Sequence, residues 1–74
     1  MFSKKFKKIG LKIAYYRKRK ALKQMEVAEK AGISCSYLYK IETGKVRYSL
    51  AVLIQIAKVL DIDPGELLTD GSSY

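Results

Sequence analysis

Residues 24–47 include polar, basic and aromatic side chains that can contact a partner molecule. The amide of Gln24, placed where a helix would begin, suits an anionic oxygen. The ammonium group of Lys40 can donate to O6 and N7 of guanine, and the hydroxyl group of Ser36 can pair with several bases. Cys35 and Tyr39 offer mainly apolar contact, for example to a thymine methyl group. These are contacts that the side-chain chemistry permits; the chemistry by itself assigns none of them to a base or a phosphate.

The residues needed for other kinds of chemistry are missing from the sequence. It has no histidine and one cysteine, and it shows neither a paired-carboxylate site nor a glycine loop that would cradle phosphate, so we do not expect an enzyme. We also expect no metal, cofactor, small-molecule ligand or intramolecular disulfide. The longest apolar run, Leu50–Ile54, is far shorter than the roughly 20 residues of a membrane span. A reducing, cytoplasmic and nucleoid-associated location is therefore predicted.

Positive charge is concentrated at the N-terminal end. Residues 1–23 carry ten Lys or Arg and no acid, whereas residues 24–74 carry five Lys or Arg and seven acids. Such asymmetry favours a polyanionic partner, either nucleic acid or an anionic membrane surface. A basic segment that is merely solvated is the alternative. The membrane alternative is weaker because the apolar stripe of the first helix is narrow and is needed for the core.

Apolar spacing and end signals predict five short helices and no strand. Ile9, Ile13 and Tyr16 share one helical face between about residues 6 and 20. Gly32 ends a second helix over about 23–31, and Ser34 caps a third. The fourth covers about 50–60 after Ser49, and the fifth begins at the Asp63-Pro64 pair. We therefore predict a compact all-α fold, with a basic arm at 1–8, one domain at 9–69 and a short tail at 70–74.

The second and third predicted helices are separated by only three residues, Gly32-Ile33-Ser34. Two helices joined so closely at a fixed angle allow the second to enter a major groove while the first lies across the backbone. The stretch from Gln24 to Thr43 resembles the helix-turn-helix of the Cro and phage-repressor (XRE) family. The resemblance extends from about Ile9 to Leu68, and its most telling residues are Arg17, Gln24, Ala28, Gly32, Ile41, Glu42, Gly44, Ile56, Ala57 and Leu60.

The resemblance implies a five-helix, lambda-repressor-like domain and a role for each matching residue. Base edges would be contacted by Cys35, Ser36, Tyr39 and Lys40, and phosphates by Gln24, Lys45, Arg47 and Tyr37. Tyr37 has an alternative, which is to pack on the loop that follows the third helix. Arg17 and Glu42 would form a partly buried ion pair that holds the third helix at its angle.

The function implied is sequence-specific binding of double-stranded DNA by a transcriptional regulator, a repressor in preference to an activator. One reading helix covers too few base pairs for a useful site, so we expect a homodimer, weak without DNA, on a palindromic operator. The alternative is an antitoxin-like or accessory protein-interaction module. Three residues depart from the family pattern: Lys23 in place of a capping Ser or Thr, Ala21 in place of a glycine, and Tyr48 in place of a proline.

Overall fold

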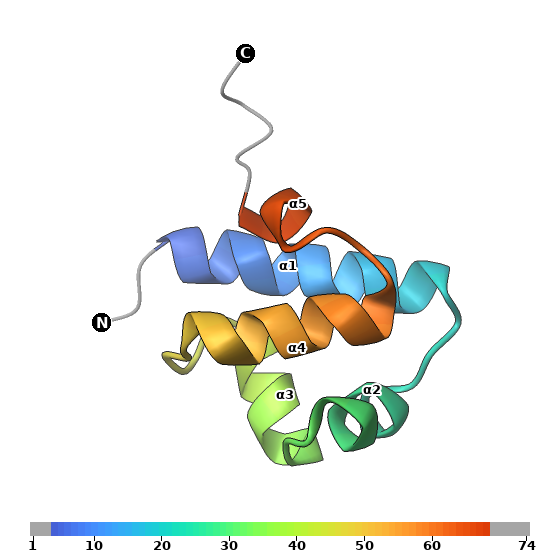
Figure 1. Ribbon diagram of the computed structural model, residues 1–74. Coiled ribbons are helices and arrows are strands. Elements are labelled where there is room, and N and C mark those ends of the chain that lie inside the picture. Colours follow the sequence, from blue (N-terminus) through green and yellow to red (C-terminus); the bar gives the residue numbers. More distant parts are fainter. Residues whose placement is uncertain (1–3, 69–74) are drawn as a thin grey trace.

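Residues 4–68 are described by the structure, a computed structural model. They form five helices and contain no strand, as the sequence predicts for an all-α fold (Figure 1). The helices are α1 (Lys4–Arg19), α2 (Gln24–Ala31), α3 (Cys35–Glu42), α4 (Leu50–Leu60) and α5 (Pro64–Leu68). None of the helices within this part of the chain is long and apolar enough to cross a membrane.

The turn between α2 and α3 is built by the residues that the sequence analysis identified. Gly32 adopts the left-handed conformation with φ of 75°, which costs a glycine little. The chain then folds back, and the N–H of Ile33 donates to the carbonyl oxygen of Ala28 at 3.0 Å. The hydroxyl group of Ser34 accepts from the N–H of Tyr37 at 3.0 Å and so caps α3. Local sequence therefore determines this turn.

The start of α1 differs from the expectation. Residues 1–8 were set apart as a basic arm, whereas α1 begins at Lys4, so that residues 4–8 are helical. The physical reason is Phe6, whose ring meets the ring of Tyr48 edge to face with centroids 5.0 Å apart. That contact gives the first turn of α1 an apolar anchor. Because lysines flank Phe6 on both sides, the sequence pattern does not indicate this apolar contact.

Helix ends also use signals that the sequence analysis did not anticipate. The side chain of Lys23 cannot accept a hydrogen bond, but its backbone N–H donates to the carboxylate of Glu26 at 2.8 Å, which supplies half of a capping box. Ala21 stands where the family pattern has a glycine, and its φ is 57°. This left-handed conformation costs little for glycine but is strained for alanine. Asp61, rather than a glycine, ends α4 in the left-handed region with φ also 57°.

The two longest helices, α1 and α4, lie side by side, with α5 packed on them at one end of the molecule and α2 and α3 at the other (Figure 1). The core is aliphatic, and its largest fully buried side chains are Ile13, Leu38, Ile41, Leu53, Ile56, Leu60, Leu67 and Val27. Gly10 lies where α1 crosses α3. A Cβ at this position would be 2.6 Å from the carbonyl oxygen of Glu42, so only glycine permits this close approach.

Candidate nucleic-acid interface

The outer face of α3 carries the four residues predicted to contact bases. Cys35, Ser36, Tyr39 and Lys40 are all exposed, and the Tyr39 side chain keeps 48% of its surface accessible. Leu38 and Ile41, on the opposite face of the same helix, are 0% exposed. The helix is thus held by one apolar face and presents a polar and aromatic face to solvent, as the spacing of these residues requires.

The angle of α3 is set by its packing on α2 and α1. Val27 and Ala28 of α2 are 0% and 2% exposed. The short side chain of Ala28 suits the tight turn in which its carbonyl oxygen also accepts from Ile33. On the other side, Gly10 lets α1 touch the end of α3. Because interiors are densely packed, these contacts allow little rotation of α3.

An ion pair joins α1 to the last residue of α3. The Nε of Arg17 donates to Oε2 of Glu42 at 2.7 Å, and its Nη2 donates to Oε1 at 3.1 Å, which forms a bidentate fork. The remaining guanidinium nitrogen, Nη1, donates to the carbonyl oxygen of Leu22 at 2.9 Å. The two side chains are 11% and 5% exposed. Arg17 therefore ties α3 and the α1–α2 loop together.

Gln24 has a structural contact that the sequence analysis missed. Its Nε2 donates to Oε1 of Glu42 at 3.0 Å. The amide expected to contact a phosphate is therefore anchored within the protein, and its second N–H group is the one left for an outside oxygen. Glu42 accepts from both α1 and α2. The sole sequence signal for this was the isolated acid at the end of an otherwise neutral or basic helix.

Burial of this acid also determines the charge of the interface. Glu42 is the sole acid in α3. It is 6% exposed and accepts three hydrogen bonds, two from Arg17 and one from Gln24. Lys40 is the charged residue that remains on the exposed face of α3. The reading face therefore carries positive charge, which suits a polyanion.

The loop after α3 contributes cations beside this face. Lys45 and Arg47 are exposed, and the ammonium nitrogen of Lys45 lies 5.8 Å from the ring centroid of Tyr39, a cation–π distance. Tyr37 is half-buried, and its hydroxyl group donates to the carbonyl oxygen of Arg47 at 3.3 Å. Of the two roles left open for Tyr37, the structure shows packing on the loop.

Tyr48 is the second feature of this loop that sequence reasoning missed. Its hydroxyl group is buried and has no hydrogen-bond partner among the residues that the structure describes. Burial raises the pKa of Tyr48 to about 12, with a smaller contribution from Tyr37. The ring packs against Phe6, so Tyr48 supports the loop with its apolar surface. The position of one tyrosine in a loop gave no sign of this burial.

Residues 4–68 include no group of three or more Cys, Asp or Glu side chains placed to hold a metal ion. The described contacts around α3 are hydrogen bonds, one ion pair, a cation–π contact and apolar packing. They hold α3 in place with its polar and aromatic face exposed to solvent.

Comparison with known proteins gives a consistent result. The family model described as helix-turn-helix matches residues 13–67. The HTH-type transcriptional regulator SinR of Bacillus subtilis is 40% identical over 63 residues, which is 84% of this chain and 57% of SinR. The ImmF control region 10 kDa protein of Bacillus phage phi105 is 42% identical over 57 residues, or 77% of this chain and 63% of that protein. The chain thus spans less than two thirds of either relative.

Solved structures share the same arrangement of helices. The restriction-modification controller protein C.AhdI of Aeromonas hydrophila superimposes with a TM-score of 0.85 and 32% identity, covering 88% of this chain and 98% of that one. SinR in complex with DNA superimposes with a TM-score of 0.77 and 40% identity, covering 82% of this chain and 98% of that one.

Proposed function

This chain belongs to the Cro and phage-repressor (XRE) family of helix-turn-helix proteins, and on that premise we propose that it binds double-stranded DNA sequence-specifically and regulates transcription, as a repressor in preference to an activator. The family and the fold are those of transcription regulators, which are not enzymes. The observation that carries the proposal is the exposed face of α3, with Ser36, Tyr39 and Lys40 in solvent above a fully buried apolar face. We propose a cytoplasmic location for this activity, at the nucleoid.

Each exposed residue of α3 has a proposed part in reading bases. Lys40 donates to O6 and N7 of guanine, and Ser36 pairs with a base edge. Tyr39 and Cys35 contact apolar groups such as the thymine methyl group. SinR, 40% identical to this chain, has been solved in complex with DNA, which supports the same mode of binding here.

Phosphate contacts come from residues around α3. Lys45 and Arg47 supply positive charge from the loop after α3, and Gln24 offers its second amide N–H from the start of α2. Tyr37 is the weakest of the four because its hydroxyl proton already points to the Arg47 carbonyl oxygen. Phosphate contacts release counterions, so affinity falls steeply with salt. A flat plot of log affinity against log salt concentration would exclude DNA as the partner.

The test of base reading begins with selection of bound sites from a random pool of duplexes. Lys40→Ala should then weaken binding to the selected site by about 1–3 kcal/mol and relax preference at one base pair. Lys58→Ala, which removes an exposed lysine from α4, is the matched control and should retain the preference. Equal loss of affinity in both variants, with preference unchanged, would contradict the assignment of Lys40.

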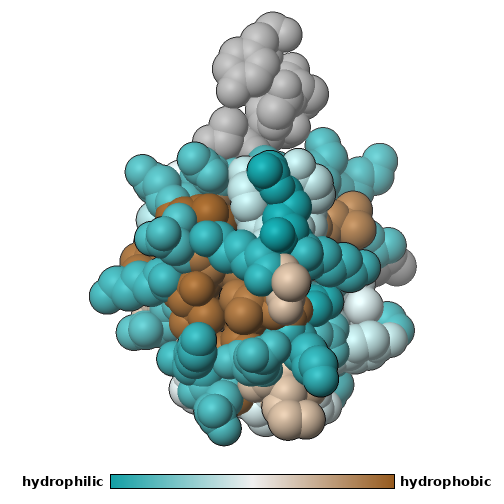
Figure 2. Space-filling view, turned by 90° about the vertical axis from the view of Figure 1, so that its right-hand side faces the viewer, coloured by the Kyte–Doolittle hydropathy of each residue, from teal (hydrophilic) through white to brown (hydrophobic). Residues whose placement is uncertain are grey.

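We propose that the chain binds its operator as a homodimer through residues 61–68, the region implied by the family resemblance; Tyr74, also considered for this contact, lies outside the described residues. Val59 and Ile62 are only partly buried although apolar. Figure 2 shows an apolar area bordered by hydrophilic side chains on the side of the molecule where the α4–α5 connection lies. A symmetric pair presents two α3 helices about 34 Å apart, which fits a palindromic site.

Sedimentation of the complex with DNA tests this arrangement. Two protein chains per duplex and an imperfect palindrome among the selected sites are the expected results. The free protein is expected to be largely monomeric, because so small a chain offers little surface for a standard interface. Tight binding of one copy to a non-palindromic site at physiological salt would contradict the proposed dimer.

A further inference from the structure

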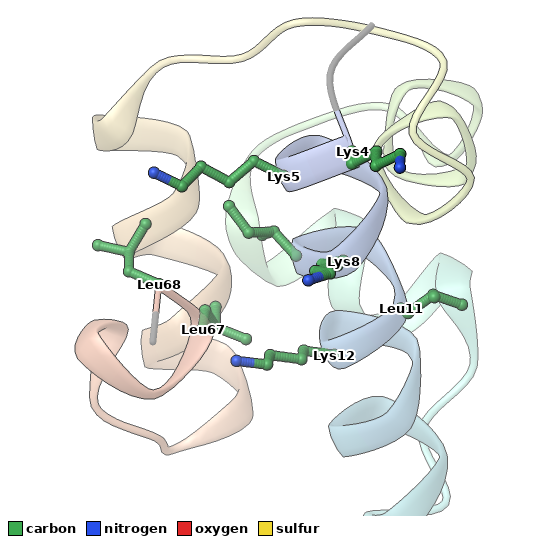
Figure 3. Close-up of a pocket in the computed structure, with 8 residues that line it drawn as sticks. Lys4, Lys5, Lys8, Leu11, Lys12, Leu67 and Leu68 are labelled. Atoms are coloured by element: carbon green, nitrogen blue, oxygen red, sulfur yellow. The ribbon is translucent and has the colours of Figure 1, made fainter. Parts of the chain in front are cut away.

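An apolar groove between α1 and α5 is lined by four lysines of α1. The groove has a volume of about 230 Å³. Ile9 and Leu67 form its buried floor, and Leu68 at its edge is 47% exposed. Figure 3 shows Lys5 and Lys12 extending from α1 toward Leu68 and Leu67 of α5. The lysines that line the groove are Lys4, Lys5, Lys8 and Lys12, and none of the lining residues within 4–68 is an acid.

The proposed DNA contacts do not account for these lysines. The groove lies between α1 and α5, and Figure 1 shows α5 at the end of the molecule away from α2 and α3. A duplex bound to the exposed face of α3 would therefore lie away from α5 and the groove edge that α5 forms. The sequence analysis assigned the positive charge of residues 1–23 to one polyanionic partner. The lysines that line the groove are instead grouped beside α5.

The size of the groove indicates what can enter it. Pockets that enclose a small molecule usually measure about 300–1,000 Å³, so this one is small for a complete ligand. It can take one or two large apolar side chains from the face of an amphipathic helix, which is a common mode of protein recognition. The lysine side chains can lie along the apolar surface with their ammonium groups toward the rim.

We propose that this groove binds an acidic amphipathic helix of a partner protein. Leucine or phenylalanine side chains of the partner enter between Ile9, Leu67 and Leu68, and carboxylates beside them contact the lysines of α1. The proposed homodimer uses residues 61–68, so a second copy and the partner helix compete for Leu67 and Leu68. A symmetric contact centred on the groove itself would place the same four lysines against one another. The inference goes beyond DNA binding and does not depend on it.

The test uses a synthetic amphipathic helix of about 16 residues, with leucines on one face and glutamates on the other, labelled for fluorescence anisotropy. The full chain should bind it saturably without DNA, and should not bind a version in which lysines replace the glutamates. In nitrogen–proton NMR spectra the peptide should shift amide signals of α1 and α5 while signals of α3 stay in place. Operator DNA should weaken peptide binding, because the homodimer proposed to form on it uses residues 61–68 and therefore competes for Leu67 and Leu68.

Matched variants separate groove binding from general attraction to a basic protein. Lys5→Glu combined with Lys12→Glu should weaken peptide binding at least about tenfold. Lys18→Glu combined with Lys58→Glu makes the same change in charge outside the groove and should have a much smaller effect. Leu68→Ser should also weaken binding, whereas Leu50→Ser, which replaces another exposed leucine, should not.

Thermal unfolding of each variant verifies that it is folded, which is expected because all the substituted side chains are largely exposed or at the rim. The proposal is overturned if the peptide does not bind. Equal loss in groove and control variants overturns it too. A third result would also overturn the proposal: groove variants that lose self-association in sedimentation but still bind the peptide. The groove would then belong to a contact between two copies of the chain. Loss of DNA binding in Lys40→Ala is a separate result and leaves this inference unaffected.

Discussion

Replacing Arg17 by alanine removes three hydrogen bonds at once. Two of them end on Glu42, at 2.7 and 3.1 Å, and one ends on the carbonyl oxygen of Leu22. The carboxylate of Glu42, 5% exposed, would keep only the amide of Gln24. Breaking a buried pair by removal of one partner costs about 3–5 kcal/mol. Because Gln24 remains, we expect the lower end, about 3 kcal/mol.

That loss is large for a domain of this size. At about 0.05–0.15 kcal/mol per residue, a chain of 74 residues has a free energy of unfolding of about 4–11 kcal/mol. For such a domain each kcal/mol lowers Tm by about 4–8 °C, so Arg17→Ala should lower Tm by about 12–24 °C. Urea unfolding followed by circular dichroism should show a lower midpoint with an unchanged slope.

A double-mutant cycle with Glu42→Gln isolates the pair. If the ion pair causes the loss, Arg17→Ala should cost markedly less in the Glu42→Gln background, because the stranded charge is then gone. DNA affinity measured below the unfolding transition should fall as well, since the end of α3 loses its tie to α1. A loss below about 1 kcal/mol, typical of an exposed pair, or a fully additive cycle would refute this account.

Three further substitutions test other parts of the structure. Tyr48→Phe should leave stability unchanged or raise it by up to about 1 kcal/mol, because it removes a buried hydroxyl group without a described partner. Burial raises the pKa of Tyr48 from 10.0 to about 12, so the folded state holds the phenol proton more tightly than the unfolded state. The contribution of this proton to the free energy of unfolding is therefore lost as pH rises from 10 toward 12. In urea titrations at alkaline pH, the free energy of unfolding of Tyr48→Phe should fall less steeply with pH than that of the unsubstituted protein, and parallel curves would contradict the assignment. Gly10→Ala should destabilise the fold by about 1–3 kcal/mol, because its Cβ would collide with the carbonyl oxygens of Ile41 and Glu42; an unchanged Tm would mean that α1 and α3 separate easily. Ala21→Gly should raise the free energy of unfolding by about 0.5–1 kcal/mol by relieving a φ of 57°, and a decrease in chemical denaturation would show that the loop is not strained there.

Local features of the sequence are sufficient for much of the interface. Helix periodicity puts Leu38 and Ile41 inside and Tyr39 and Lys40 outside, because residues three and four apart share a face regardless of what the helix packs against. Gly32 and Ser34 mark the turn through conformational preferences of single residues. The Arg17–Glu42 pair came from family resemblance rather than from local pattern, and the structure supplies its geometry.

Other features depend on which surfaces meet, and no local pattern encodes that. Gln24 reaches Glu42 across 18 positions of sequence, and Phe6 anchors the first turn of α1 only because Tyr48 arrives from the loop before α4. Nothing in the sequence distinguishes Gly10 from other residues of the helix. The need for glycine at this position arises only because α3 packs against it. Likewise, the lysines of α1 form one basic run in the sequence, but packing of α5 on α1 makes some of them the rim of an apolar groove. The sequence determines the helices and the face that each one presents, whereas long-range packing decides the partner of each buried polar group and the direction of the positive charge.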